Sequence, residues 1–234
     1  MASESNHPVN QLDRVICQIR FPAVLEIDKR VDEFQKMIRS EYPRYSQSAP
    51  IPLNLLDAPI PVDHVFQSAD SHWSINLSVA ALSLTTTHYT NWAEFRRRFV
   101  KALDAVKELF EISECHRVGL RYINAIRPSS VGLNDPIQAL RSPYAEMMSP
   151  AMGKFRSMNA IQEYTVPDDI FCRSIIGSIQ FSNGDSGTLI DDDTSVEKTV
   201  SLDRVAAILD NLKETSLDVF KNIASDELIN KVVS

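Results

Sequence analysis

Two long amphipathic segments constrain the fold of this chain more than any other feature. Residues 91–112 place apolar side chains along one stripe of a helix: Trp92, Phe95, Phe99, Leu103, Val106 and Phe110. Residues 201–223 do the same with Leu202, Val205, Ile208, Leu212, Val219 and Phe220. Each segment follows three β-rich segments, so each predicts a helix that covers one face of a sheet.

The same order of elements occurs twice along the chain. The first half predicts a strand, a helix, three strands and the long helix, at residues 14–22, 28–43, 64–70, 72–79, 81–89 and 91–112. The second half predicts the same order at residues 115–128, 133–148, 158–167, 170–182, 186–192 and 201–223, with a short tail helix at 226–233. The helix at 133–148 is expected to be short and interrupted near Pro143. The fold class is therefore α+β, with two pseudo-repeated β-α-β-β-β-α units whose largely antiparallel sheets each lie under a long helix.

The first strands of the two halves also resemble each other in sequence. "DRVICQIRFP" aligns with "HRVGLRYINAIRP", so that Arg14 matches Arg117 and Val15 matches Val118. We expect a flexible arm at 1–12 and units at 13–112 and 113–234. Because half a chain of this size buries little surface alone, the two units should share a core as one compact domain.

One helix per unit covers one sheet face, so the opposite face is expected to be partly free. It would suit a concave binding surface across both halves. Alternatively, the proline-rich loop predicted at 44–64 or another subunit would cover it. The sequence leaves these alternatives open.

Composition excludes some classes of function. The 234 residues are 44% hydrophobic and carry a net charge of −7, which disfavours nucleic-acid binding as the main task. No apolar run approaches the roughly 18 residues of a membrane span. The three cysteines are Cys17, Cys115 and Cys172, and their spacing suggests no pair, so we expect reduced thiols and a cytoplasmic protein.

The strand at 115–128 contains the first candidate site. On a strand Arg121 and Asn124 point to opposite faces, so one of them should face the helices and the other the free side. Both side chains could simply tie down neighbouring loops. Alternatively, Arg121 binds a carboxylate or phosphate, and Tyr122, Asn124 and His88 line a ligand pocket between the halves.

Basic residues on the helix at 91–112 form a second candidate. Arg96, Arg97 and Lys101 lie mostly off the apolar stripe and could contact an anion, including single-stranded nucleic acid. Such a run is also typical of a solvated helix face.

The acidic segment "NGDSGTLIDDDTS" is the best metal candidate. Asp191 and Asp193, together with Asp185 and Asp192, could hold Mg²⁺ or Ca²⁺ through oxygen ligands. The spacing does not match an EF-hand, and charge at the edge of a strand explains the run equally well. Nucleotide-binding and hydrolase motifs are also missing, so we expect no metal or other cofactor.

The chain as a whole resembles a sporadically distributed, functionally uncharacterised family of prokaryotic proteins. The firmest matching segments are "HYTNWAEF" and "GLRYIN". The resemblance brings no assigned enzyme activity. Its scattered distribution is typical of mobile genes and suggests a role in phage defence or in a toxin–antitoxin-like module.

We therefore expect a non-enzymatic protein-binding, scaffold or accessory protein that acts through a broad surface on a protein partner or as a homodimer. The alternative is a small-ligand sensor or enzyme with a pocket between the two halves.

Overall fold

Nine antiparallel strands form one sheet in the order β2-β3-β4-β5-β1-β7-β10-β9-β8. The computed structural model describes residues 12–48, 63–149, 153 and 155–232. The strands are β1 (Leu12–Arg20), β2 (Arg44–Ser48), β3 (Asp63–Gln67), β4 (Trp73–Ser78), β5 (Ala81–Thr86), β7 (Arg117–Ile126), β8 (Asn159–Val166), β9 (Ile170–Gln180) and β10 (Ser186–Val196).

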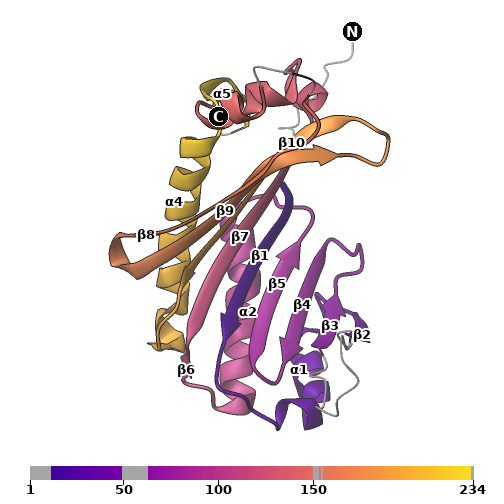
Figure 1. Ribbon diagram of the computed structural model, residues 1–234. Helices are drawn as coiled ribbons and strands as arrows, with labels where there is room; N and C mark the ends of the chain where they lie inside the picture. The colour runs from indigo at the N-terminus through magenta and orange to yellow at the C-terminus, as the bar shows by residue number, and fades with distance from the viewer. Residues whose placement is uncertain (1–11, 49–62, 150–152, 154, 233–234) are drawn as a thin grey trace, which may run out of the picture.

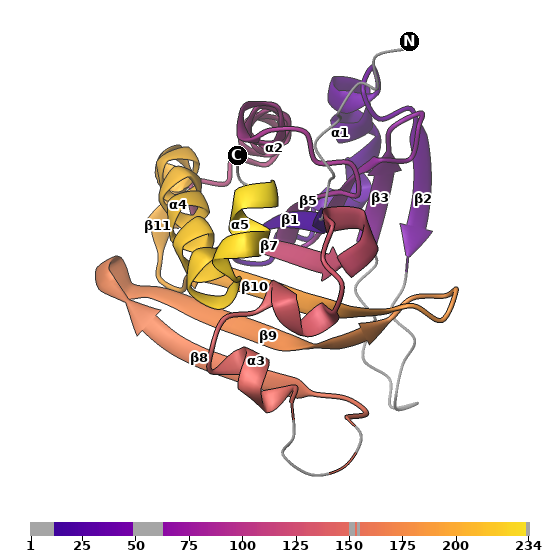
Figure 2. The same cartoon turned by 90° about the horizontal axis from the view of Figure 1, so that it is seen from above.

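Three helices lie on one side of this sheet, as Figure 1 and Figure 2 show. They are α1 (Val31–Ile38), α2 (Trp92–Phe110) and α4 (Val205–Ile223). The opposite side of the sheet therefore carries none of these three helices. The α+β class and the large antiparallel sheet are thus confirmed.

Shorter elements lie around the sheet. The helix α5 (Asp226–Val232) lies near its upper end in Figure 1, and α3 (Tyr144–Met147) lies beside β8 in Figure 2. β6 (Glu114–Cys115) and β11 (Val200–Ser201) form a separate two-stranded pair. Short 3₁₀ helices in the described ranges are Ile27–Lys29, Pro128–Val131, Pro136–Ala139, Pro167–Asp169 and Leu202–Arg204.

The two halves of the chain meet where β1 pairs with β7. Cys17 lies opposite Leu120, and Val15 lies opposite Tyr122. The buried residues Val15, Cys17 and Leu120 face the helices and belong to a hydrophobic core that contains residues of both halves. The strand pairing therefore joins two groups of strands under one continuous core.

The predicted apolar stripe of α2 is confirmed. Phe95, Phe99 and Val106 are fully buried, whereas Trp92 is half-buried at the start of the helix. The predicted helix start is also correct, because the Asn91 side chain accepts a hydrogen bond of 2.9 Å from the backbone N–H of Glu94. The inner face predicted for residues 201–223 is partly correct, since Ile208 is only half-buried.

Several sequence-based element boundaries were wrong. Residues 44–48, predicted as part of a loop, form β2, which pairs with β3 although all its residues are exposed and show no apolar alternation. β10 continues through Asp193 to Val196, because β7 and β9 both pair with it. The segment at 133–148, predicted as a short helix interrupted near Pro143, forms a 3₁₀ helix before Pro143 and α3 directly after it, so the predicted interruption is confirmed. Most of the predicted arm (1–11) and of the proline-rich loop (49–62) lies outside the described residues.

β2 is attached to the sheet by side chains as well as by its backbone. The Tyr45 ring packs on the buried Phe66 ring at 5.4 Å between centroids. Its hydroxyl lies 2.9 Å from Nδ1 of the buried His64, whose Nε2 lies 3.0 Å from Asp28 Oδ1. These side-chain contacts hold the edge strand β2 against β3.

The aromatic cluster at the start of α2 should contribute strongly to stability. The Phe95 ring lies 6.0 Å from Trp73 and 5.9 Å from Trp92 between centroids, and it is fully buried. We expect Phe95→Ala to lower the free energy of unfolding by about 3–5 kcal/mol, because it leaves a cavity beneath the helix. Urea denaturation measures this change. The exposed neighbour Ala93 provides the control, and Ala93→Ser should change stability by less than about 0.5 kcal/mol. Equal effects of both variants would contradict this account of the core.

Candidate functional site

The side of the sheet opposite α1, α2 and α4, which we call the open face, carries rows of polar side chains that cross both halves. One row runs from β3 to β8 through Gln67, Ser74, Thr85, Ile16, Arg121, Asp193, Arg173 and Glu163. The next row runs through Val65, Asn76, Ser83, Gln18, Gly119, Ser195, Phe171 and Thr165. The open face is thus a continuous and largely polar surface.

Ion pairs organise the second half of the open face. Arg121 binds Asp191 in a bidentate pair, with Nε–Oδ1 and Nη2–Oδ2 distances of 2.7 and 2.6 Å. Arg117 Nη2 contacts both carboxylate oxygens of Asp193 at 3.1 Å. The Arg117 guanidinium lies over Gly119, where any β-carbon would collide with it. A glycine at this position therefore allows the Arg117–Asp193 pair to form.

The four residues predicted to bind a ligand or partner do not line one pocket. Arg121 lies on the open face, whereas Tyr122 and Asn124 point to the helix side. The Asn124 amide donates a 3.2 Å hydrogen bond to the carbonyl of Ile190, and Tyr122 packs edge-on against Tyr89. His88 is exposed and stacks on His72 with ring centroids 4.9 Å apart. The sequence correctly placed Arg121 and Asn124 on opposite faces, but a shared pocket does not follow.

The acidic run is divided by the alternation of the strand. Asp191 and Asp193 lie on the open face and bind arginines, and Asp185 pairs with Arg127 at 2.9 Å. Asp192 points to the helix side. In the part of the chain that the structure describes, no cluster of three or more His, Cys, Asp or Glu side chains has the geometry of a metal site. The run lies within a central strand and does not mark an edge.

Asp192 is the unusual acid that the sequence did not single out. It is 1% exposed, and neither carboxylate oxygen has a hydrogen-bond partner among the described residues. Burial raises its pKa to about 7, and the charge of Asp191 adds to this effect, although the nearby Ser174 hydroxyl opposes it. The only sequence signal was its position in the acidic run, where its direction depended on the strand register.

Asp192 lies among other polar groups whose ionisation is suppressed. Burial raises the pKa of Tyr164 to about 12 and that of Cys172 to about 11. Burial also raises the pKa of Tyr122, which lies opposite Asp192 on β7. The described part of this region contributes no cation to compensate Asp192.

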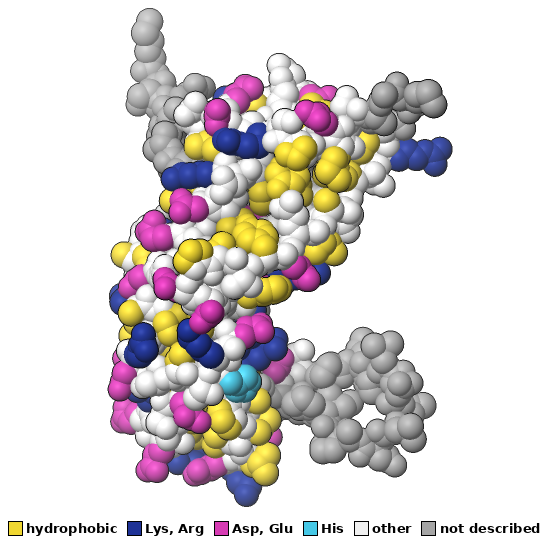
Figure 3. Space-filling view, turned by 60° about the vertical axis from the view of Figure 1, so that its left-hand side comes forward, with side chains coloured by type: hydrophobic (Ala, Val, Ile, Leu, Met, Phe, Trp, Pro, Cys, Tyr) yellow, Lys and Arg dark blue, Asp and Glu magenta, His cyan; other side chains and the backbone are white. Residues whose placement is uncertain are grey.

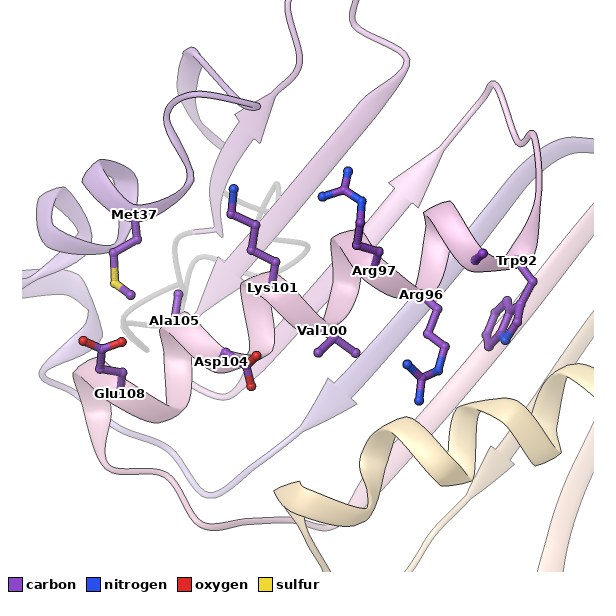
Figure 4. Close-up of a pocket in the computed structure, with 10 residues that line it drawn as sticks. Met37, Trp92, Arg96, Arg97, Val100, Lys101, Asp104, Ala105 and Glu108 are labelled. Carbon is purple, nitrogen blue, oxygen red and sulfur yellow. The ribbon is translucent and has the colours of Figure 1, made fainter.

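The basic residues of α2 border a shallow groove of about 730 Å³ on the outer surface of the helix, as Figure 4 shows. Each of them already contacts a carboxylate. Arg96 lies 2.9 Å from Asp210, Arg97 lies 2.9 Å from Glu94, and Lys101 lies 2.6 Å from Glu41. Burial opposes ionisation of Glu41, but hydrogen bonds from Lys101 and Arg97 outweigh it and lower its pKa to about 2.

This pairing changes the chemical character of the α2 groove. An anionic ligand at Arg96, Arg97 and Lys101 would have to displace existing carboxylates. The groove therefore offers a mixed-charge surface and not a free anion site.

The last strand of the sheet, β8, forms an exposed edge. Among the described residues no strand pairs with its outer side. Ile161 and Tyr164 on this strand are 55% and 38% exposed, and Met147 on α3 is 53% exposed. Hydrophobic side chains gather in the upper part of the face shown in Figure 3, which brings the β8 side of the molecule forward. An exposed edge with apolar side chains is typical of an interaction site.

Comparison with protein-family models finds no matching family, and comparison with curated proteins finds no similar sequence. None of the helices in the described ranges is long and apolar enough to cross a membrane.

The Arg121–Asp191 pair should matter more than an exposed pair. Asp191 is 6% exposed, so Arg121→Ala would leave a buried charge without its partner. We expect a loss of about 1–3 kcal/mol in the free energy of unfolding, with part of it recovered in Arg121→Ala/Asp191→Ala. The exposed Lys36–Asp32 pair is the control, and Lys36→Ala should change the free energy of unfolding much less than Arg121→Ala does. A double-mutant cycle by urea denaturation with no coupling between Arg121 and Asp191 would refute this.

Asp192 should make the protein less stable as the pH rises. Its pKa is 3.8 in the unfolded reference and about 7 in the folded protein, so the folded state binds the proton more tightly. Stability should therefore fall between about pH 4 and pH 7. Asp192→Asn should raise the free energy of unfolding by roughly 2–4 kcal/mol at pH 8 and change it little near pH 4. Denaturation curves at both pH values measure this, and an equal gain at both would contradict the assignment.

Proposed function

We propose that this protein is a non-enzymatic protein-binding scaffold that works through the open face. The observation that carries the proposal is the continuous polar surface across both halves, with α1, α2 and α4 all on the other side of the sheet. Half-buried polar side chains on this face, among them Gln18, Ser74 and Ser83, would offer a partner hydrogen-bonding groups.

We also infer that the two halves arose from one duplicated unit. The strand order β3-β4-β5-β1 corresponds to β8-β9-β10-β7, with each set read toward the centre of the sheet. If Arg14 corresponds to Arg117, an approximate two-fold axis passes through the Cys17–Leu120 pair, because these two residues are both equivalent and directly opposite. Under this correspondence the buried Asp192 occupies the position that Leu82 has in the first half.

A protein partner fits the open face better than a small ligand does. The pocket hypothesis required four side chains to converge, namely Arg121, Tyr122, Asn124 and His88. These side chains do not converge, because Arg121 points away from Tyr122 and Asn124, and His88 stacks on His72. Nucleic acid is disfavoured by the net charge of −7 and by the carboxylates that hold the basic residues of α2.

The setting in the cell is proposed from the sequence resemblance alone. The scattered prokaryotic family that the chain resembles supports an accessory role in a cytoplasmic phage-defence or toxin–antitoxin-like module. The partner would then be another protein of that module.

A bulky charge on the open face should prevent partner binding. Ser83 lies in the middle of β5, half-buried on this face, so Ser83→Arg would obstruct a partner without entering the core. Ala93→Arg on the outer surface of α2 is the matched control. Tagged protein isolated from the native host should retain its partner with the control and lose it with Ser83→Arg. Loss with Ala93→Arg alone would move the binding site to the α2 groove and refute the proposal.

A further inference from the structure

The two ends of the sheet differ in one strand. In the first half, a row of helix-side residues passes from Cys17 through Leu84 and Ile75 to Phe66, and Tyr45 of β2 completes it. In the second half, the row that corresponds to it runs from Leu120 through Thr194 and Cys172 to Tyr164. Tyr164 is the last residue of its row, because β8 ends the sheet of described residues.

The exposure of these residues reflects this difference. Phe66 is fully buried beside β2, whereas Tyr164, which occupies the corresponding position under the proposed duplication, is 38% exposed. Among the described residues, the second half therefore lacks the strand that covers the corresponding edge in the first half. A strand from another molecule on β8 would provide it.

The hydrogen-bond pattern shows which groups are available on this edge. The carbonyl of Met158 accepts a 3.0 Å hydrogen bond from the Ser178 N–H, so Met158 and every second residue after it face β9. The backbone groups of Asn159, Ile161, Glu163 and Thr165 therefore point outward. They can pair with an added antiparallel strand without any change in the β8–β9 ladder.

A second copy of β8 satisfies this pattern in one register. With Gln162 opposite Gln162 of the other copy, Ile161 pairs with Glu163 and Asn159 pairs with Thr165, so every outward-pointing residue has a partner. Centring the pairing on Glu163 would place two carboxylates opposite each other and Pro167, which has no N–H, opposite Asn159. Centring it on Ile161 would leave Thr165 outside the strand pairing.

The side chains of β8 are also sterically and electrostatically compatible with the register centred on Gln162. The small Ala160 of one copy would lie opposite the partly exposed Tyr164 of the other, and the two Gln162 amides would lie side by side. Glu163 would face Ile161 while it keeps its 3.0 Å contact with Arg173 on its own sheet. No like charges face each other in this arrangement.

We propose that β8 pairs with β8 of a second copy of this chain across a two-fold axis at Gln162, which joins the two sheets and their open faces. The inference uses the duplication proposed above, but it concerns a different surface from the partner site on the open face. The kind of interaction is strand addition at a sheet edge.

Disulfide formation tests both the dimer and its register. Directly opposite residues without mutual hydrogen bonds lie about 4.5 Å apart between Cα atoms, within the range for a disulfide of about 4.4–6.8 Å. Gln162→Cys should therefore form a reducible covalent dimer under mild oxidation. The three native cysteines are buried, and burial raises the pKa of each thiol, so they should not react. The matched controls are Thr165→Cys on β8 and Gln47→Cys on β2, and neither should cross-link.

Light scattering on the protein without substitutions gives an independent measurement and should report a dimer mass. Ile161→Pro removes an outward N–H and should shift the mass to that of a monomer, while the β8–β9 ladder stays intact. A monomeric mass, together with a Gln162→Cys variant that does not cross-link, would overturn the proposal. Cross-linking of the Thr165→Cys variant instead would overturn the register. A monomer that loses a host partner with Ile161→Pro would assign the edge to another protein and also overturn the dimer.

The two proposals fail separately. Loss of partner capture with Ser83→Arg in a monomeric protein would support the function and reject the dimer. A Gln162→Cys variant that cross-links, in a protein whose interactions are unaffected by Ser83→Arg, would support the dimer and reject the function of the open face.

Discussion

The antiparallel pairing of β1 with β7 is the interaction on which the rest of the structure depends. It places Cys17 opposite Leu120 at the centre of the sheet and joins the strands of both halves without a break. Because α2 and α4 both pack on the same side, one hydrophobic cluster contains buried residues of both halves, among the described residues. The other side of the sheet needs no apolar cover, since its alternate residues are largely polar. The open face is therefore a direct result of how the two halves meet.

The two-residue alternation of side chains along β10 explains why its aspartates have different environments. Adjacent aspartates point to opposite sides, so Asp191 and Asp193 bind arginines on the open face, while Asp192 enters the helix side without a cation. A carboxylate buried in this way reduces stability at neutral pH. The protein thus maintains a destabilising group next to a network of ion pairs, and the pKa of Asp192 near 7 makes the destabilisation depend on pH.

The two ends of the sheet differ because only one of them has an additional strand, β2. At one end β2 covers β3, and Tyr45 is held there by Phe66 and His64. At the other end β8 has no neighbour among the described residues and exposes Ile161 and Tyr164. An edge of this kind favours the addition of another strand, and the sequence of β8 can pair with itself.

The sequence alone determined the two long helices, most of the strands and the opposite directions of Arg121 and Asn124, because these follow from local periodicity of 3.6 or 2 residues. It did not reveal β2, whose exposed residues have no apolar pattern, or the partners of Arg96, Arg97 and Lys101. Asp210 of α4 and Glu41, which follows α1, are distant from these basic residues in the chain. Only the tertiary structure could decide that Asp192 is buried and that β8 is an edge, because both depend on which strands lie side by side.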